Sequence, residues 1–337
     1  MDNKSWNVAD LLQLSGGYWS ACALHAGVKL DLFTPLAERP RTTPELAGLL
    51  KNDGRGLAML VTALAAMGLL EKIGDSFTTT PFAAEHLSRT SPKYLGHIIL
   101  HHHHLMAGWS RLDEAVASGG PVLERVSHAD DEAARESFLM GMFNLAMQIA
   151  PGIVAGIDLQ GRRRLLDLGG GPGTYAVHFC QHNSRLEAVV YDLPSTRRFA
   201  EQTIARFGLS DRIAFAEGDF IGGEIPGRYD VAWLSHILHA ESPEGCATII
   251  RKALAALEPG GMILVQEFIL DDSMDGPLFP ALFSLNMLVG TTSGQAYSQG
   301  ELFAMLAAEG VTGLRRLPME LPNGAGVIAG IVPGSGT

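Results

Sequence analysis

One stretch of the chain constrains its fold more than any other: residues 164–180, RLLDLGGGPGTYAVHFC. Its first residues form a short apolar run, which predicts a buried parallel strand. A glycine-rich loop follows, and a helix is predicted from Tyr175 to Cys180. Strand, glycine loop and helix together form the first unit of a doubly wound α/β nucleotide-binding domain. Glycines allow the backbone to turn sharply and to approach a ligand closely, and the free N–H groups that open the helix face a polar or anionic group.

The spacing of the glycines separates two kinds of nucleotide site. Gly169 and Gly171 match the start of the dinucleotide fingerprint G-x-G-x-x-G, but Thr174 stands where its third glycine is required. Asp167, two residues before the first glycine, also lies outside that fingerprint. The pattern Asp-x-Gly-x-Gly-x-Gly, which includes Gly173, resembles motif I of class I S-adenosylmethionine methyltransferases. By itself the motif is also compatible with a tight turn that only packs a helix on a sheet.

Composition and charge argue against several other classes of protein. A length of 337 residues predicts one large or two ordinary domains, and 47% apolar with 18% charged residues is typical of a globular protein. The net charge of −11 argues against a broad nucleic-acid surface. The sequence has no run of 18 apolar residues, and its start lacks a signal-peptide core. Three widely spaced cysteines fit neither a disulfide framework nor a zinc site, so we expect a cytoplasmic protein that contacts neither nucleic acid nor membrane.

The first 120 residues predict a small helical domain. Helical periodicity covers residues 6–33, and a second helix is predicted with Thr43 as its N-cap and Pro44 in its first turn. A third helix is predicted from Gly56 to Leu70, with a small β-wing over residues 71–80. Three helices followed by a wing are the winged-helix pattern.

That pattern usually suggests DNA binding, which the residues here do not favour. The candidate recognition helix, GRGLAMLVTALAAMGLL, carries Arg55 as its only charge. Over residues 1–120, ten Lys or Arg are balanced by eleven Asp or Glu. A helix in a DNA groove needs Arg, Lys, Asn or Gln to reach phosphates and bases, whereas an apolar helix is a packing element. We therefore expect this domain to be buried in a homodimer.

Two further helices are predicted before the glycine loop. The first, from Lys93 to Ser118, contains the run His101 to His104, whose four side chains point around a full helical turn and cannot converge on one metal. We expect these histidines at a surface or interface, one of them possible in a substrate pocket, and we predict no metal site. After a linker over residues 121–131, a Met-rich helix is predicted from Glu132 to Ala150, ending before Pro151.

Acidic residues follow the next two predicted strands. Asp192 ends the strand that begins at Leu186, 23 residues beyond Gly169. An ionised carboxylate there can accept hydrogen bonds from both hydroxyls of a ribose, and a helix cap is the alternative role of Asp192. The strand from Arg212 to Ala216 leads to Gly218, Asp219 and Phe220, which could contact an adenine ring.

Two histidines follow the fourth strand, which is predicted from Tyr229 to Ser235. His236 and His239 lie at its carboxyl end, where open α/β sheets bind ligands. A helix is predicted from Glu244 to Leu257, with Pro259, Gly260 and Gly261 as its stop. A fifth strand, from Met262 to Ile269, carries Glu267 near its carboxyl end.

Six segments in a fixed order make the resemblance specific: DLGGGPGTY, VVYDLPS, EGDF, LSHILHAESPE, LEPGGMILVQEFIL and LFSLNMLVGTTSG. From about residue 8 to 332 the chain resembles the bacterial and plant small-molecule O-methyltransferases, which include hydroxyindole and caffeate enzymes. The resemblance implies an α/β, class I Rossmann-like sheet, mostly parallel with an antiparallel last strand, after a winged-helix dimerisation domain. It also implies three parts: a dimerisation domain over 1–120, a helical connector to the substrate pocket over 121–160, and a catalytic domain over 161–337.

The resemblance assigns roles to named residues. His239 matches the family's catalytic base, and Glu267 matches an acid that flanks it. The residues that would bind S-adenosylmethionine and its product S-adenosylhomocysteine are Asp167, Gly169, Gly171, Gly173, Asp192, Leu193, Gly218, Asp219, Phe220, Ser235 and His236. The substrate would contact Phe138, Met142, Phe143, Asn286 and Met287, with Tyr18 or Trp19 from the partner subunit. A role in the apolar core is the alternative for each of these substrate residues.

Two departures from the family pattern leave alternatives open. Ala240 and Glu241 stand where the family often has Asp-Trp, and Ala296 stands in place of a second acid. His236 is therefore a second candidate base. We expect methyl transfer from S-adenosylmethionine to a phenolic hydroxyl of a small aromatic metabolite. The alternatives are a divergent reaction with the same cofactor (C-methylation, hydroxylation or decarboxylation), a winged-helix ligand-sensing regulator and, least favoured, an NAD dehydrogenase.

Overall fold

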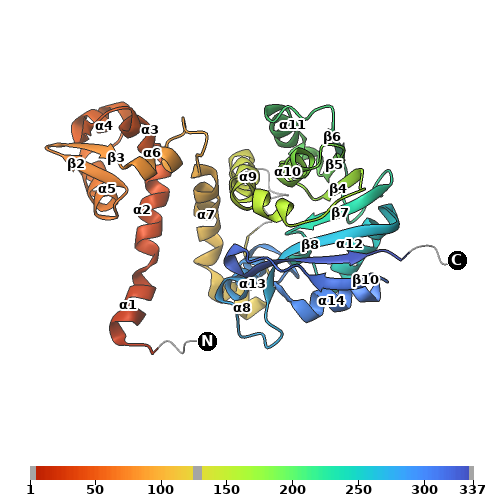
Figure 1. Ribbon diagram of the computed structural model, residues 1–337. Helices are drawn as coiled ribbons and strands as arrows, with labels where there is room; N and C mark the ends of the chain where they lie inside the picture. The colour runs from red at the N-terminus through yellow and green to blue at the C-terminus, as the bar shows by residue number, and fades with distance from the viewer. Residues whose placement is uncertain (1–4, 124–130, 334–337) are drawn as a thin grey trace. The chain divides into compact units, whose positions relative to one another are not determined.

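The computed structural model describes residues 5–123 and 131–333. Its chain forms two compact units. The first comprises Met1–Met106 and Glu136–Asn144, and the second comprises Ala107–Arg135 and Leu145–Thr337. Figure 1 shows the helices of the first unit in red to yellow and the sheet of the second in green to blue.

The first unit is mainly helical. Its helices are α1 (Val8–Gly16), α2 (Tyr18–Lys29), α3 (Phe33–Glu38), α4 (Thr43–Leu50), α5 (Gly54–Ala66), α6 (Pro81–Leu87) and most of α7 (Gly96–Trp109). A small antiparallel sheet has the order β1 (Arg41–Thr42), β3 (Ser76–Thr79), β2 (Leu70–Ile73), and it contains the predicted wing. Leu32, Phe33, Leu36, Leu46, Val61 and Leu64 form its fully buried core. The apolar face of α5 is thus used for packing within the unit.

Several predicted helix boundaries in this region are wrong, and the third predicted helix ends at Ala66 instead of Leu70. The N-cap of α4 is Thr42, not Thr43, because the Thr42 hydroxyl accepts from the Glu45 amide while the Glu45 carboxylate accepts from the Thr42 amide at 2.7 Å. The single helix predicted from Lys93 to Ser118 is divided into α7 and α8 (Leu112–Ser118). At Arg111 the backbone leaves the helical region (φ −118°, ψ 23°), and the guanidinium bonds the Glu114 carboxylate and the Val122 carbonyl.

Helix α9 (Glu132–Ala155) also differs from its prediction, because it continues through Pro151 instead of ending before it. Proline removes one backbone donor and is unfavourable inside a helix. Here the turn beyond it places Ile153 and Val154, each 1% exposed, in the core, and this burial opposes the cost of the proline. Among the described helices, α9 alone has the length and apolar composition that could span a membrane, a test that core helices also pass.

The second unit contains a mostly parallel sheet, as predicted. Its strand order is β10 (Thr312–Arg316), β11 (Ala325–Ile331), β8 (Leu257–Leu270), β7 (Tyr229–Ser235), β4 (Arg164–Leu168), β5 (Glu187–Asp192) and β6 (Ile213–Glu217), with β9 (Tyr297–Ser298) paired to β8. Strands β4 to β8 run parallel, whereas β11 is antiparallel to both β8 and β10. The packed helices are α10 (Thr174–His182), α11 (Arg197–Arg206), α12 (Pro243–Ala256), α13 (Leu278–Gly290) and α14 (Gln299–Ala308).

The predicted start of the fifth strand needs correction. Strand β8 begins at Leu257, so that Pro259, Gly260 and Gly261 lie within it rather than forming the helix stop. Its pairing with β7 shifts between Tyr229↔Leu257 and Val231↔Met262, so the extra residues of β8 bulge there.

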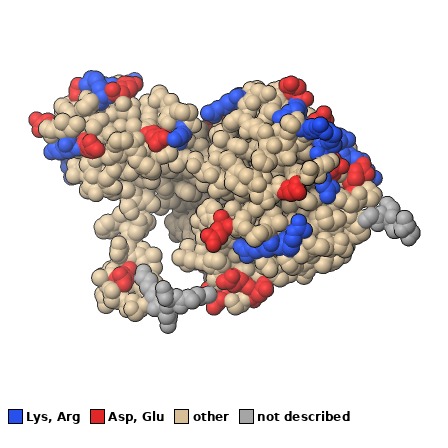
Figure 2. Space-filling model, in the orientation of Figure 1, with Lys and Arg blue, Asp and Glu red and all other residues tan. Residues whose placement is uncertain are grey.

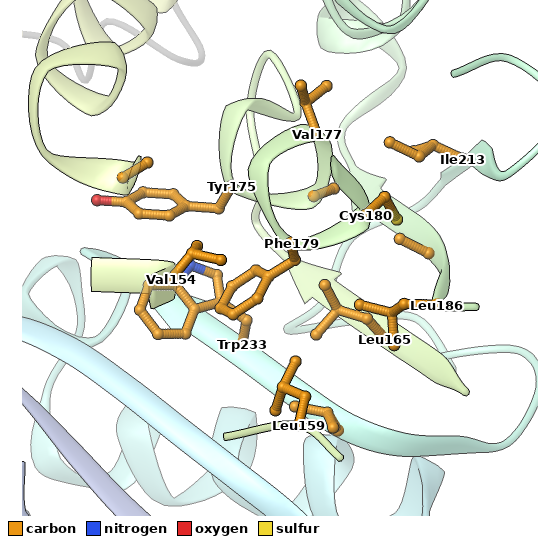
Figure 3. Packing of buried hydrophobic residues seen from close by; sticks show 14 of the residues in the cluster. Val154, Leu159, Leu165, Tyr175, Val177, Phe179, Cys180, Leu186, Ile213 and Trp233 are labelled. Carbon is orange, nitrogen blue, oxygen red and sulfur yellow. The ribbon is translucent and has the colours of Figure 1, made fainter. Parts of the chain in front are cut away.

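Two cores enclose this sheet. Along β7, Val231 and Trp233 face one core while Ala232 and Leu234 face the other, as the alternation of side chains in a strand requires. Figure 3 shows Trp233 packed against Tyr175 and Phe179 of α10, with ring centroids 4.9 and 5.2 Å apart. This close packing fixes the carboxyl ends of the strands, where the predicted site residues lie.

Candidate active site

The glycine loop after β4 has a conformation that glycine favours. Gly169, Gly171 and Gly173 all have positive φ angles, of 65°, 55° and 75°. A Cβ atom on Gly169 would lie 2.6 Å from the Ile237 side chain, and one on Gly173 would lie 3.1 Å from Val190. At Gly171, in contrast, no described heavy atom lies within 4 Å of that position. The loop is therefore packed at both ends and open in its middle.

Asp167 lies beneath this loop. One carboxylate oxygen, Oδ2, accepts from the Ala176 amide at 3.1 Å, near the start of α10. The other, Oδ1, is buried and accepts no hydrogen bond from the described part of the chain. Burial raises the pKa of Asp167 to about 7, and the nearby Asp192 carboxylate adds to the shift. Asp167 is thus placed to support the loop and the helix start from below.

Asp192, at the end of β5, joins the second strand to the glycine loop. Its Oδ2 atom accepts from the Gly171 amide at 2.8 Å, and its Oδ1 atom accepts from the Leu193 amide at 2.6 Å and the Thr196 hydroxyl at 3.3 Å. Burial raises the pKa of Asp192, and these hydrogen bonds oppose the shift. A carboxylate has about four acceptor positions, so three bonds leave room for another donor. Asp192 therefore caps the turn that follows it and can also accept from a ligand.

The other predicted cofactor residues lie at the ends of the neighbouring strands. The Gly218 amide donates to the Asp192 carbonyl at 3.0 Å. The Phe220 ring lies beside the glycine loop, 3.3 Å from the position of a Gly169 Cβ.

Asp219 accepts from the Ile221 amide, and the Ser235 hydroxyl donates to the Gln266 side chain at 3.1 Å. The structure brings together the glycine loop, Asp192, Leu193, Gly218 and Phe220. The Asp219 Oδ1 atom and the Ser235 hydroxyl, in contrast, form hydrogen bonds with other residues of the fold.

A histidine and a buried glutamate meet where β7 and β8 end. His239 Nδ1 lies 2.7 Å from Oε2 of Glu267, which is 2% exposed. The Leu238 and His239 amides donate to Oε1 of the same carboxylate at 2.9 and 3.3 Å. Burial alone would raise the pKa of Glu267, but the imidazoles of His239 and His236 hold it well below its usual range. An ionised carboxylate only accepts hydrogen bonds, so Nδ1 of His239 donates and Nε2 is left able to accept a proton.

Three phenylalanines beside this pair were missed by the sequence reasoning. The Phe283 ring of α13 meets the His239 ring edge to face, with centroids 4.7 Å apart. Phe268 of β8 lies 4.8 Å from both Phe279 and Phe283. The four-residue spacing of Phe279 and Phe283, which places them on one face of a helix, was the available signal. We call Phe268, Phe279 and Phe283 the aromatic wall.

Comparison with known proteins decides the family. The family model of the O-methyltransferase domain matches residues 109–312, and that of the O-methyltransferase dimerisation domain matches residues 12–89. The chain belongs to the O-methyltransferase family.

Individual relatives extend this methyltransferase assignment over almost the whole chain. The enzyme is 34% identical to the 3-hydroxy-5-methyl-1-naphthoate 3-O-methyltransferase of Streptomyces sahachiroi, with 95% of this chain and 94% of the relative covered. It is 33% identical to the tetracenomycin polyketide synthesis 8-O-methyl transferase TcmO of Streptomyces glaucescens, with 93% and 94% covered. The structure of PigF with S-adenosylhomocysteine matches with a TM-score of 0.87 and 27% identity, covering 97% of this chain and 100% of that one. PigF is a Serratia methyltransferase, and S-adenosylmethionine is the cofactor of the present enzyme.

The geometry of the methyltransferase fits this cofactor. Gly171 leaves open space above the loop, and Asp192 keeps an acceptor position for a ribose hydroxyl. Both features lie at the carboxyl ends of parallel strands, where such sheets bind nucleotides.

The predicted substrate residues of the methyltransferase are divided between its two units. Phe138, Met142 and Phe143 belong to the part of α9 in the first unit, where the Phe138 ring lies 5.2 Å from that of His101. Asn286 and Met287 belong to α13 in the second unit, and the Asn286 side chain accepts from the Trp109 indole at 2.9 Å. Their contribution to one pocket remains a prediction.

The histidine run diverges around α7, as its spacing predicts. His103 Nε2 lies 3.0 Å from the Lys29 ammonium, whereas His101 is 8% exposed, and burial lowers its pKa to about 4. His101 is therefore buried rather than at the surface, and the alternative that one histidine of the run lines a substrate pocket stays a prediction.

Proposed function

We propose that this O-methyltransferase methylates a phenolic hydroxyl of a small aromatic metabolite, with His239 as the general base. The observation that carries the proposal is the 2.7 Å contact between His239 Nδ1 and the buried Glu267 carboxylate. The aromatic wall and the two relatives, which are named for a hydroxynaphthoate and for tetracenomycin synthesis, support an aromatic substrate.

The proposed chemistry needs a base because a free phenol has a pKa of roughly 10, as tyrosine does, and is mostly protonated at neutral pH. His239 would accept the hydroxyl proton at Nε2 as the oxygen is methylated, a contribution of about 10² to 10⁴ in rate. Glu267 would hold the ring in the required tautomer and stabilise the imidazolium that forms. When bound, S-adenosylmethionine supplies the electrophilic methyl group. The glycine loop, Asp192 and Phe220 are the residues proposed to hold it.

The matched dimerisation domain supports a homodimer. In that homodimer, the exposed side chains of Tyr18 and Trp19, 57% and 71% accessible, are proposed to complete the partner's substrate pocket. The proposed location is the cytoplasm.

The test of the base compares His239→Ala with His182→Ala, which changes an exposed histidine at the end of α10. Enzyme is incubated with S-adenosylmethionine and 3-hydroxy-5-methyl-1-naphthoate, then with simpler phenols, and methyl ethers are measured by mass spectrometry. We expect His239→Ala to lower kcat at least about 100-fold while the affinity for S-adenosylmethionine, measured by calorimetry, changes little. The His182 variant should behave as the wild type does.

Two results would contradict separate parts of the proposal. Full activity in His239→Ala would remove His239 as the base. Methyl gain at a carbon or nitrogen of the accepted substrates, with none at oxygen, would remove the phenolic assignment.

A further inference from the structure

A second histidine approaches the same buried carboxylate as His239. His236 Nδ1 lies 3.5 Å from Oε2 of Glu267, the oxygen that His239 contacts at 2.7 Å. The centroids of the two imidazoles are 5.9 Å apart. His236 Nδ1 is buried, and no described residue offers it a hydrogen bond within normal geometry. One carboxylate oxygen thus has two imidazole nitrogens directed at it.

The backbone places His236 in this position at a cost. His236 follows the last residue of β7 with a φ of +56°, in the left-handed region that non-glycine residues rarely adopt. Its amide donates to the Gln266 carbonyl at 2.8 Å, and its ring lies 4.3 Å from the ring of Phe268. The turn therefore directs the imidazole back toward β8. Strained residues of this kind persist where the surrounding structure fixes them, often at functional sites.

The charge balance at this point depends on few groups. On α12 the Cys246 thiol faces Glu267, but burial raises the pKa of that thiol to about 12. On β9 the Tyr297 hydroxyl, whose pKa is also raised by burial, donates to the backbone carbonyl of Glu241. The Glu241 carboxylate, on the loop before α12, acts on both of these groups. From α13, the Phe283 ring faces His239. One buried carboxylate and two imidazoles accordingly set the local charge.

We propose that His236 is a positioning residue, which shares Oε2 of Glu267 with His239 and so limits how strongly the carboxylate retains a proton on His239. The inference rests on the proposed role of His239 as the base. A carboxylate oxygen that holds one N–H by a hydrogen bond and has a second imidazole nitrogen 3.5 Å away has less negative charge available for the first. The imidazolium of His239 is then stabilised less, and its neutral, proton-accepting form persists to lower pH. Without His236, a larger fraction of the enzyme would hold His239 protonated at a given pH and be unable to start the reaction.

Two substitutions separate this role from a structural one. His236→Gly removes the imidazole and suits the positive φ angle. His236→Asn also tolerates that angle, and its Nδ2 atom is attached to Cγ, as Nδ1 is in histidine, so that it can donate to Oε2 of Glu267. If the glycine variant does not fold, His236→Ala, which also lacks a donor, carries the same expectation.

The experiment measures the protonation of His239 in the cofactor-free enzyme by NMR of labelled histidine rings. The His239 signal is identified by its loss in His239→Gln. His236→Gly removes the 3.5 Å contact between its imidazole and Glu267, so the protonation midpoint of His239 should rise by about 0.5 to 1 pH unit in this variant. The acidic midpoint of the kcat profile should rise with it. In His236→Asn both midpoints should stay within about 0.2 pH unit of the wild-type values.

Three other outcomes would overturn the inference. An unchanged His239 midpoint in the glycine or alanine variant would show that His236 does not act through Glu267. Equal shifts in the glycine and asparagine variants would assign the effect to loss of the ring. Weaker S-adenosylmethionine binding in both variants, with unchanged midpoints, would make His236 only a cofactor contact. If His239→Ala retained full activity, the proposed base would fail instead, and the NMR titration would still report on the contact between His236 and Glu267.

Discussion

At the scale of single residues, the proposed chemistry depends on the 2.7 Å contact between His239 Nδ1 and the Glu267 carboxylate. His239 and Glu267 were predicted from the family segments that contain them. Their contact depends on the pairing of β7 with β8, in which Ser235 lies opposite Gln266, and a register cannot be deduced from composition or periodicity. The approach of His236 to Glu267 depends on one left-handed residue, for which the sequence gives no glycine or asparagine as a signal.

A testable expectation at the scale of residues concerns the pKa of Asp167. Burial raises its pKa to about 7 in the folded chain, against about 3.9 when unfolded. The folded state therefore binds this proton more tightly, and the associated stability is lost as the pH rises from about 4 through 7. Asp167→Asn keeps an acceptor for the Ala176 amide and cannot ionise. At pH 8 it should stabilise the cofactor-free enzyme, by up to about 4 kcal/mol.

Thermal unfolding at pH 5 and pH 8 tests this expectation. The stability advantage of Asp167→Asn over the wild type should be larger at pH 8. Asp211→Asn, at an exposed position, is the control and should show no such difference between the two pH values. A stability advantage of Asp167→Asn that is equal at both pH values would contradict the inference that burial raises the pKa of Asp167.

At the scale of elements, two of the glycines with positive φ and open Cβ positions allow a matched comparison. Gly171 in the loop and Gly68 after α5 both have positive φ, and neither Cβ position has a described atom within 4 Å. Alanine at either site should cost about 1 kcal/mol of stability, because a left-handed backbone disfavours a Cβ atom. Only Gly171→Ala should weaken S-adenosylmethionine binding, by at least about tenfold, since only Gly171 is proposed to face the cofactor. Calorimetric titration measures this affinity, and equal affinity in the two variants would contradict the proposed contact between the glycine loop and the cofactor.

Element boundaries were less predictable than element types. The strands β4 to β7 were predicted to within one residue at almost every end, because parallel strands appear as short apolar runs between turn signals. The continuation of α9 through Pro151 was not predictable, since it depends on the core that Ile153 and Val154 enter. The break at Arg111 was missed because it depends on the partners of one guanidinium.

At the scale of the whole molecule, the matched dimerisation domain gives the exposed apolar side chains of α1 an interpretation. Val8, Leu11, Leu12 and Leu14 are 75%, 57%, 66% and 66% exposed. Figure 2 shows mostly uncharged side chains over this helix, at the lower left of the view. A buried leucine contributes about 1.5 to 3 kcal/mol, so a contiguous set of this kind can contribute substantially to subunit association.

The corresponding prediction concerns the oligomeric state. Leu11→Asp combined with Leu12→Asp should raise the dissociation constant of the homodimer at least about 100-fold, because carboxylates would be buried in an apolar contact. Analytical ultracentrifugation measures the change. Ile73→Asp, at a 55% exposed residue of the wing strand β2, is the control and should remain dimeric. A dimer of unchanged affinity in the α1 variant would place the interface elsewhere.

The order of the antiparallel strands has a consequence for shortened forms of the enzyme. Strand β10 precedes β11 in the chain but reaches the sheet only through it, since β11 lies between β10 and β8. A premature stop codon before Ala325 would thus remove one strand and detach a second. It would also expose the seven residues of β8, Met262 to Phe268, that β11 pairs with. Such an unpaired, largely apolar edge is a template for joining other chains, so the expected fate of the truncated protein is insolubility rather than a smaller working enzyme.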